Sequence, residues 1–247
     1  MSFRTVFGLT LAICLWSVAP AMAAPTTEAN SAFETGIEAY RTGDIATAVT
    51  SWTTAAEGGH PAAGFLMGRL YEVGNGVEKS AYQSFRFYEM AAKEGNVQAA
   101  AKVGVIYRDG SKELDIKKDY ALAMQNFEKG ALAFWPESQY YIADMYRRGL
   151  GVNADRTEGL RWLLLAAKKR YAPAHLELAR IYFAGEGVLQ DRITGWSFID
   201  SAARFADKDE RKLVNTAMDK YRQRMKPGET DVAKVQADTW VMENIKG

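Results

Sequence analysis

The 247-residue sequence predicts an all-α protein: an α/α superhelical solenoid of about five helix-turn-helix repeats, followed by C-terminal capping helices. Two series of residues support this prediction. Pairs of small residues recur at spacings of 36, 39, 36 and 36 positions, and tyrosines recur at 36, 39 and 36. Because both series share one period and one three-residue insertion, they indicate an internal repeat. The small pairs begin at Ala55, Ala91, Gly130, Ala166 and Ala202, and the repeat tyrosines are Tyr71, Tyr107, Tyr146 and Tyr182.

Residues 1–23 have the pattern of a secretory signal peptide. Arg4 precedes an apolar run over residues 6–18, and an A-x-A cleavage signature occupies residues 21–23. We therefore expect cleavage after Ala23 and a mature chain that is periplasmic or secreted. The apolar run is too short for a good membrane span, so no transmembrane helix is expected after cleavage. A retained N-terminal anchor is the alternative.

The composition of the mature chain excludes some classes of function. Cys14, the only cysteine, lies in the predicted signal peptide, so the mature chain offers neither disulfides nor thiol chemistry. Its acidic and basic residues balance, and its short basic stretches follow helix C-termini, so no nucleic acid partner is expected. Residues 147–226 carry 17 basic and 10 acidic residues. This excess could steer an acidic partner, but the interspersed acids favour a solvated surface.

Each repeat, within residues 31–206, is predicted to contain a helix, a turn and a second helix. A glycine three residues after each repeat tyrosine ends the first helix, because glycine enters the left-handed region at little cost. An Asp or Ser eleven residues before each small pair starts the second helix, since its side-chain oxygen accepts hydrogen bonds from free amides of the first turn. The glycines are Gly74, Gly110, Gly149 and Gly185, and the capping residues are Asp44, Ser80, Asp119, Asp155 and Asp191.

The two ends of the chain and the third repeat depart from this unit. Residues 24–30 are predicted to be a flexible N-terminus, before a shorter first repeat. The three-residue insertion lengthens the turn of the third repeat, and we expect an exposed loop over residues 111–116. Residues 207–247 are predicted to form two helices, over 207–225 and 230–244, which cap the solenoid. Alternatively, the last helix is an arm that binds a partner.

The repeat resembles that of the Sel1-like repeat family, whose units are similar to tetratricopeptide repeats. Three segments carry the resemblance: LMGRLYEVGNGV at 66–77, ADMYRRGLGV at 143–152 and ELARIYFAGEGV at 177–188. It extends over residues 31–206, although the third unit lacks the Gly-x-Gly-Val motif. The resemblance implies an adaptor or regulatory role. Exported bacterial members include regulators that restrain a two-component sensor of exopolysaccharide synthesis, and others that assist envelope or motility assemblies.

The residues indicate no catalytic, cofactor-binding or metal-binding constellation. The Gly-x-Gly segments follow helices, whereas a dinucleotide-binding loop follows a strand, and no Gly-Lys-Ser/Thr completes a P-loop. The two histidines, His60 and His175, belong to different units and have no Cys or His companion, so they are expected at surfaces or interfaces and not in a zinc site. We therefore expect a protein that is not an enzyme and has no cofactor.

One surface remains as a candidate binding site. In a helix-pair solenoid the first helices face the inner side, and three positions of each are free to vary: five and two before the repeat tyrosine, and one after it. We call these twelve residues the inner stripe; a plain solvated face is the alternative. They are Leu66, Arg69, Glu72, Lys102, Val105, Arg108, Tyr141, Asp144, Arg147, Glu177, Arg180 and Phe183. The predicted partner-binding residues are Arg69, Lys102, Arg108, Tyr141, Arg147, Arg180 and Phe183, since arginines and aromatics are enriched at interfaces.

Two hypotheses of function follow. The first is a non-enzymatic periplasmic scaffold or regulator that binds a protein partner, such as a membrane sensor or an envelope complex. The second is a protein that binds peptidoglycan or another polysaccharide, or that accompanies a hydrolase. This second function needs exposed aromatic platforms, for which Trp135, Trp196 and Trp240 are the candidates.

Overall fold

The structure is a computed structural model that describes residues 24–245. The predicted signal peptide, residues 1–23, lies outside the described residues. The described part contains twelve helices and no strand beyond an isolated bridge between Ser111 and Ile116. None of these helices is both long enough and apolar enough to cross a membrane. They are α1 (Thr27–Thr42), α2 (Ile45–Glu57), α3 (Pro61–Val73), α4 (Ala81–Lys93), α5 (Val97–Asp109), α6 (Tyr120–Leu132), α7 (Pro136–Arg148), α8 (Arg156–Lys168), α9 (Ala172–Ala184), α10 (Arg192–Phe205), α11 (Arg211–Arg222) and α12 (Glu229–Asn244).

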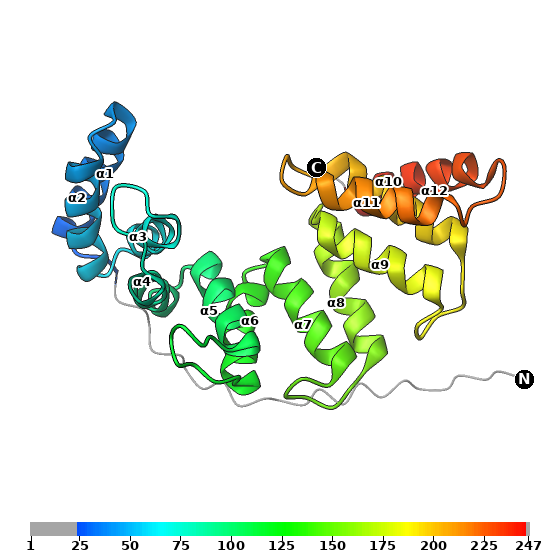
Figure 1. The fold of residues 1–247 in the computed structure, drawn as a ribbon, viewed down its shortest axis with the longest axis horizontal. Helices are drawn as coiled ribbons and strands as arrows, with labels where there is room; N and C mark the ends of the chain where they lie inside the picture. The colour runs from blue at the N-terminus through cyan, green and yellow to red at the C-terminus, as the bar shows by residue number, and fades with distance from the viewer. Residues whose placement is uncertain (1–23, 246–247) are drawn as a thin grey trace, which may run out of the picture.

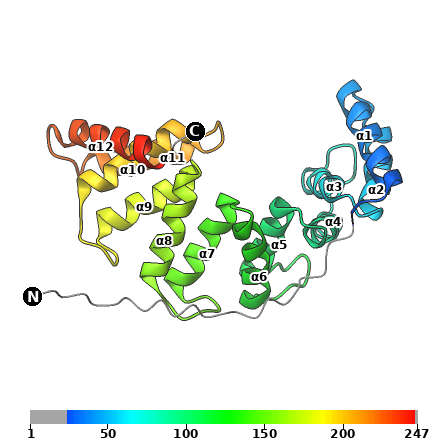
Figure 2. The ribbon, with the colours of Figure 1, turned by 180° about the vertical axis from the view of Figure 1, so that it is seen from behind.

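The helices α1 to α10 form five helix pairs, stacked one after another into an arc (Figure 1). Each helix packs chiefly against its neighbours in sequence, as expected of a solenoid. Seen from behind, the arc runs from α1 and α2 at one end to α9 to α12 at the other (Figure 2). The all-α solenoid predicted from the sequence is therefore confirmed.

Local sequence signals set the ends of most of these helices. The five predicted capping residues are the N-caps of α2, α4, α6, α8 and α10, and each side chain accepts a hydrogen bond from a backbone amide of the first turn. Three of the four predicted glycines, Gly74, Gly149 and Gly185, end α3, α7 and α9 in the left-handed conformation. Gly110 instead has φ 72° and ψ 165°, because the chain there enters the lengthened loop that the Ser111–Ile116 bridge closes.

Small residues on the first helix of a unit receive an aromatic side chain from the second. A Cβ atom added to Gly68 would lie 2.5 Å from Tyr88, and one added to Gly104 would lie 2.5 Å from Phe127. Glycine at these positions lets the two helices approach closely around the ring. The same relation holds in the first unit, where a Cβ on Gly36 would lie 2.4 Å from Trp52. The pair α1–α2 is therefore packed as a repeat.

The prediction of a flexible N-terminus over residues 24–30 is wrong for its second half. Helix α1 begins at Thr27, and Thr26 caps it by accepting a hydrogen bond from the Ala29 amide at 3.0 Å. Ala29 is buried, because its methyl group packs against Gly58 at the end of α2. The first helix is therefore longer at its start than the periodicity indicates.

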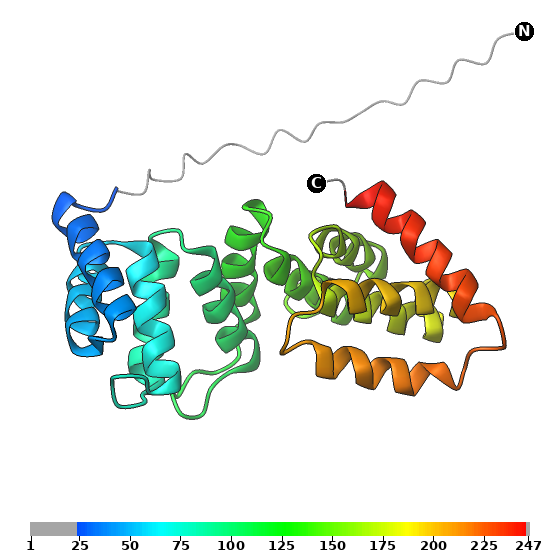
Figure 3. The same cartoon turned by 90° about the horizontal axis from the view of Figure 1, so that it is seen from above.

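Two further helices cover the C-terminal end of the solenoid. Figure 3 shows α11 and α12 on either side of α10. From α12, Trp240 packs edge-on against His175 and Phe198, with ring centroids 5.1 and 5.7 Å apart. From α11, Tyr221 stacks on a side chain of α9. Helix α12 therefore packs as a cap on α10 and not as a detached arm.

Candidate functional site

The inner stripe is a series of contacts between neighbouring repeats. In three successive cases, the residue after one repeat tyrosine meets the residue five positions before the next repeat tyrosine. We call each such contact a junction. Glu72 of α3 pairs with Lys102 of α5 at 3.1 Å. The guanidinium of Arg108 lies 4.6 Å from the ring centroid of Tyr141, and Arg147 of α7 pairs with Glu177 of α9.

Internal contacts also hold the charges at the Glu72–Lys102 and Arg108–Tyr141 junctions. The hydroxyl of Tyr88 donates a hydrogen bond to Glu72 at 2.6 Å. Burial opposes ionisation of Glu72, but the hydrogen bonds from Tyr88 and Lys102 outweigh it and lower the pKa of this carboxyl group. Arg108 pairs with the neighbouring Asp109 at 2.8 Å. The cations at Lys102 and Arg108 are therefore compensated within the chain.

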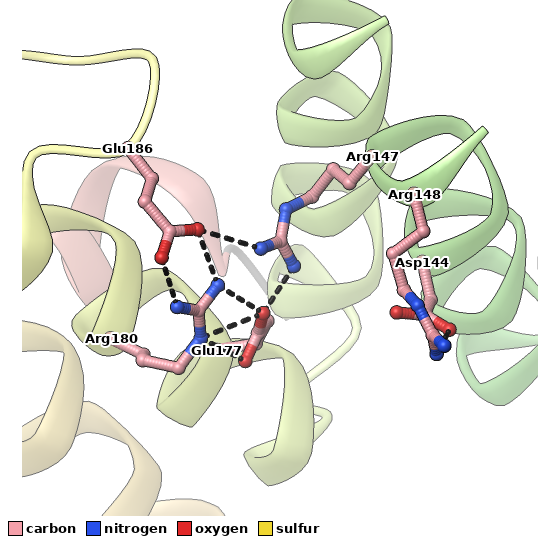
Figure 4. A network of polar contacts seen from close by, with 6 residues as sticks. All are labelled: Asp144, Arg147, Arg148, Glu177, Arg180 and Glu186. Atoms are coloured by element: carbon pink, nitrogen blue, oxygen red, sulfur yellow. Dashed lines mark hydrogen bonds and ion pairs between the residues drawn. The ribbon is translucent and has the colours of Figure 1, made fainter. Parts of the chain in front are cut away.

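The Arg147–Glu177 junction is part of a closed network of four charges (Figure 4). Arg147 and Arg180 each contact both Glu177 and Glu186, so two helices and the loop after α9 are tied together. The hydrogen bond from Arg180 is the main cause that lowers the pKa of Glu186 to about 2. The side chain of Arg147 is only 12% exposed. Both arginines, predicted as partner-binding residues, therefore already have carboxylate partners in the solenoid.

Arg148 stands apart from this network, although it is the sequence neighbour of Arg147. Its guanidinium pairs with Asp144, four residues earlier on α7, at 3.1 Å, and its side chain is 62% exposed (Figure 4). Exposed pairs of this spacing contribute only about 0.3–0.5 kcal/mol. Arg148 is therefore the more accessible of the two arginines.

The prediction that Phe183 is exposed on the inner stripe is wrong. Its side chain is fully buried and stacks on Tyr221 of α11, with ring centroids 4.2 Å apart. The guanidinium of Arg224 lies 5.1 Å from the same ring. Phe183 occupies the position that contacts the next repeat in the other units, and here the first capping helix takes the place of that repeat. Phe183 is therefore no longer a partner-binding candidate.

One further equivalent position lies between the first two helix pairs; it is open, and we call it the first junction. Gly36 faces Trp52 as Gly68 faces Tyr88, so Tyr40, four residues after Gly36, is equivalent to Glu72, four residues after Gly68. Its partner position in the next unit is Leu66, which is equivalent to Lys102. Between the side chains of Tyr40 and Leu66 lies a cavity of about 290 Å³. Arg69, a predicted partner-binding residue, lines it and has no ion pair among residues 24–245. The complete lining is Ile37, Tyr40, Trp52, Leu66, Arg69, Leu70, Val73 and Asn75.

Two of the three tryptophans considered as polysaccharide platforms are engaged inside the protein. Trp196 is only 4% exposed, and the guanidinium of Arg222 lies 5.8 Å from its ring. Trp240 packs against His175 and Phe198, as described above. The expectation of exposed rings is therefore wrong for Trp196, and Trp240 presents its ring to the protein interior.

The two histidines have structural surroundings. His60 is the N-cap of α3, where its Nδ1 accepts a hydrogen bond from the Ala63 amide at 3.2 Å. His175 is fully buried beneath α12, and its Nδ1 lies 3.0 Å from the carbonyl oxygen of Tyr171. Burial lowers the pKa of His175 to about 4. At neutral pH its imidazole is therefore uncharged.

Four segments of the chain match the family model described as Sel1 repeat: residues 61–96, 97–133, 136–171 and 172–204. They coincide with the pairs α3–α4, α5–α6, α7–α8 and α9–α10, and together they span more than half of the chain. The pair α1–α2 packs in the same way but is not among the matched segments.

Two curated relatives are similar to the chain. An exopolysaccharide production negative regulator of Rhizobium leguminosarum bv. viciae is 28% identical over 162 residues, which cover 61% of each protein. A protein of the same description from Rhizobium meliloti is 27% identical over 187 residues, covering 68% of this chain and 70% of the relative. The chain thus spans less than two thirds of the first relative's length.

Two solved structures share the fold. A protective antigen of uropathogenic Escherichia coli with an SLR fold gives a TM-score of 0.72 at 22% identity, covering 87% of this chain and 46% of that one. A Sel1 repeat protein from Oxalobacter formigenes gives a TM-score of 0.64 at 24% identity, covering 84% and 82%. At these identities the similarity concerns the fold alone.

Proposed function

Because the chain belongs to the Sel1 repeat family, we propose that it is a non-enzymatic regulatory protein that is exported and acts by binding a protein partner. Stacked repeats of this kind form an extended surface, which suits a protein partner better than a small substrate. The names of the two rhizobial relatives support a negative regulator of exopolysaccharide production. The signal-peptide pattern of residues 1–23 supports action in the periplasm, on a membrane sensor or an envelope complex.

One observation carries the binding role. The charged and aromatic residues of the inner stripe are engaged at the junctions after the first, whereas the first junction leaves Arg69 and several apolar side chains accessible on the same surface. Among residues 24–245, a partner that lies along the stripe can therefore contact unpaired side chains only at the first junction, at the N-terminal end of the solenoid. Arginine next to exposed apolar side chains is typical of protein interfaces.

The proposal is tested in cells that encode the protein. Deletion of its gene is expected to raise exopolysaccharide production, and the wild-type gene is expected to restore it. Crosslinking in intact cells, followed by mass spectrometry, should recover an envelope protein bound to a chain that begins at Ala24. Unchanged exopolysaccharide in the deletion strain, together with no crosslinked protein, would refute the regulatory and binding roles.

A further inference from the structure

The five equivalent junction positions divide into four that are filled and one that is not. Three are filled by a side chain of the next repeat, and Phe183 is covered by Tyr221 of the capping helix α11. At the remaining position, Tyr40 and Leu66 leave the cavity of about 290 Å³ between α1 and α3. Its lining residues lie on α1, α2 and α3 and in the loop that follows α3, and these helices pack against one another. The cavity is therefore already formed in the folded protein.

The open junction gathers apolar side chains that are accessible to solvent. Ile37 is 39% exposed, Tyr40 is 43% exposed and Val73 is 66% exposed, although all three line the same cavity. Trp52, which is only 2% exposed, lines the cavity from α2. Apolar surface concentrated in this way marks an interaction site, whereas single exposed apolar residues are common on any protein.

The charge at the cavity has one sign. Arg69 is the one charged residue in the lining, and no carboxylate among the described residues lies within ion-pair distance of it. Glu38, beside the lining residue Ile37, pairs with Arg41. Glu72, one turn from Arg69, pairs with Lys102, although Arg69 also contributes to the lowered pKa of Glu72 through its charge. A ligand that fills the cavity with apolar atoms can therefore place a carboxylate against Arg69, which forms paired hydrogen bonds with such groups.

We propose that the open first junction is the docking site for a segment of a protein partner that carries one large aliphatic or aromatic side chain beside a carboxylate. The inference rests on the proposed function, since it names the chemistry of that partner. The cavity lies at the lower end of the size range of small-molecule sites, so it suits a single anchoring side chain better than a cofactor. Such anchors in pockets carry much of the affinity of protein interfaces.

The chemistry is tested with small probes on the isolated chain, residues 24–247. N-acetylphenylalanine supplies a ring and a carboxylate, its amide lacks the charge, and N-acetylglycine lacks the ring. In NMR titrations, N-acetylphenylalanine is expected to shift the indole signal of Trp52 and the amides around Val73 and Asn75. Its affinity should exceed that of the amide about tenfold, and N-acetylglycine should cause no shift there. Equal affinity for acid and amide, or shifts confined to other surfaces, would overturn the proposal.

Two variants and two matched controls extend the test. R69E should reduce the affinity for N-acetylphenylalanine about tenfold and leave that for its amide unchanged, whereas R161E reverses an exposed arginine on α8 and should change neither. V73D should abolish binding of both probes, whereas V235D, at a valine on α12 that is also 66% exposed, should not. Circular dichroism checks that all four variants remain folded. Equal effects in variants and controls would contradict a site at the first junction.

The same four variants separate this inference from the proposed function. If a partner is crosslinked in cells to wild type and to both control variants but not to R69E or V73D, the docking site is supported. If R69E and V73D still bind the partner, the partner contacts another surface and the inference fails while the proposed function stands. Sedimentation velocity gives a third outcome: a dimer of the wild-type chain that V73D dissociates would show that a second copy occupies the junction, and would overturn the inference.

Discussion

Replacement of Phe183 by alanine tests whether the C-terminal helices complete the solenoid. The ring is fully buried between α9 and α11, so its removal deletes the stack on Tyr221 and leaves a cavity. Substitutions of this kind in protein cores cost about 3–5 kcal/mol. Since about 1.4 kcal/mol corresponds to a factor of ten, the equilibrium for opening α11 should rise at least about a hundredfold. The loss should be concentrated in the last repeat and α11, because repeats interact chiefly with their neighbours.

Hydrogen exchange followed by mass spectrometry measures this local opening, and urea unfolding followed by circular dichroism measures the total loss. The matched control is F134A, since Phe134 is 67% exposed and a surface substitution changes stability by only about 0.5 kcal/mol. In F183A the exchange of α9 and α11 should increase, while that of α3 and α4 stays unchanged. If F183A and F134A behaved alike, Phe183 would be a surface residue and the covering role of α11 would be wrong.

Two other predictions concern the buried histidine and the packing glycines. The pKa of His175 is about 4 in the fold against an ordinary 6.5, so between these values the unfolded chain binds a proton that the folded chain does not. The contribution of His175 to stability should therefore fall by about 3 kcal/mol as the pH drops from 6.5 to 4 and then level off, while carboxyl groups with lowered pKa values, such as Glu186, cause further loss in acid. The difference between thermal melts of the wild type and of H175Q, which should lack the histidine component, checks this. G104A should be destabilised by about 1–3 kcal/mol, because its Cβ would lie 2.5 Å from Phe127. In G43A the added Cβ would meet no atom within 4 Å, so the free energy of unfolding should fall by about 1–2 kcal/mol from the left-handed backbone alone. Urea unfolding checks both variants, and a raised urea midpoint for G104A would contradict the predicted clash.

Helix boundaries followed from the sequence where the signal is local. Asp155 accepts hydrogen bonds from the amides of Thr157 and Glu158, two and three residues further along the chain. Gly149 ends α7 for an equally local reason, the ease with which glycine enters the left-handed region. The predicted helix over 207–225 was too long at both ends, since α11 spans Arg211–Arg222. Asp207 does accept hydrogen bonds from the amides of Asp209 and Glu210, but they close a turn that comes before α11.

The sequence by itself determined the period, the order of the helices and the residues that cap them, because caps and turns depend on neighbours within a few positions and the same local signals recur in each repeat. Only the tertiary structure decided what the inner stripe presents. Arg147 meets Glu177 thirty residues later, and Phe183 meets Tyr221 in a helix outside the repeat. Such contacts depend on how each unit packs on the next, and the periodic pattern of the sequence does not contain the geometry of that packing. For the same reason, only the fold showed that the first junction, beside Arg69, stays open.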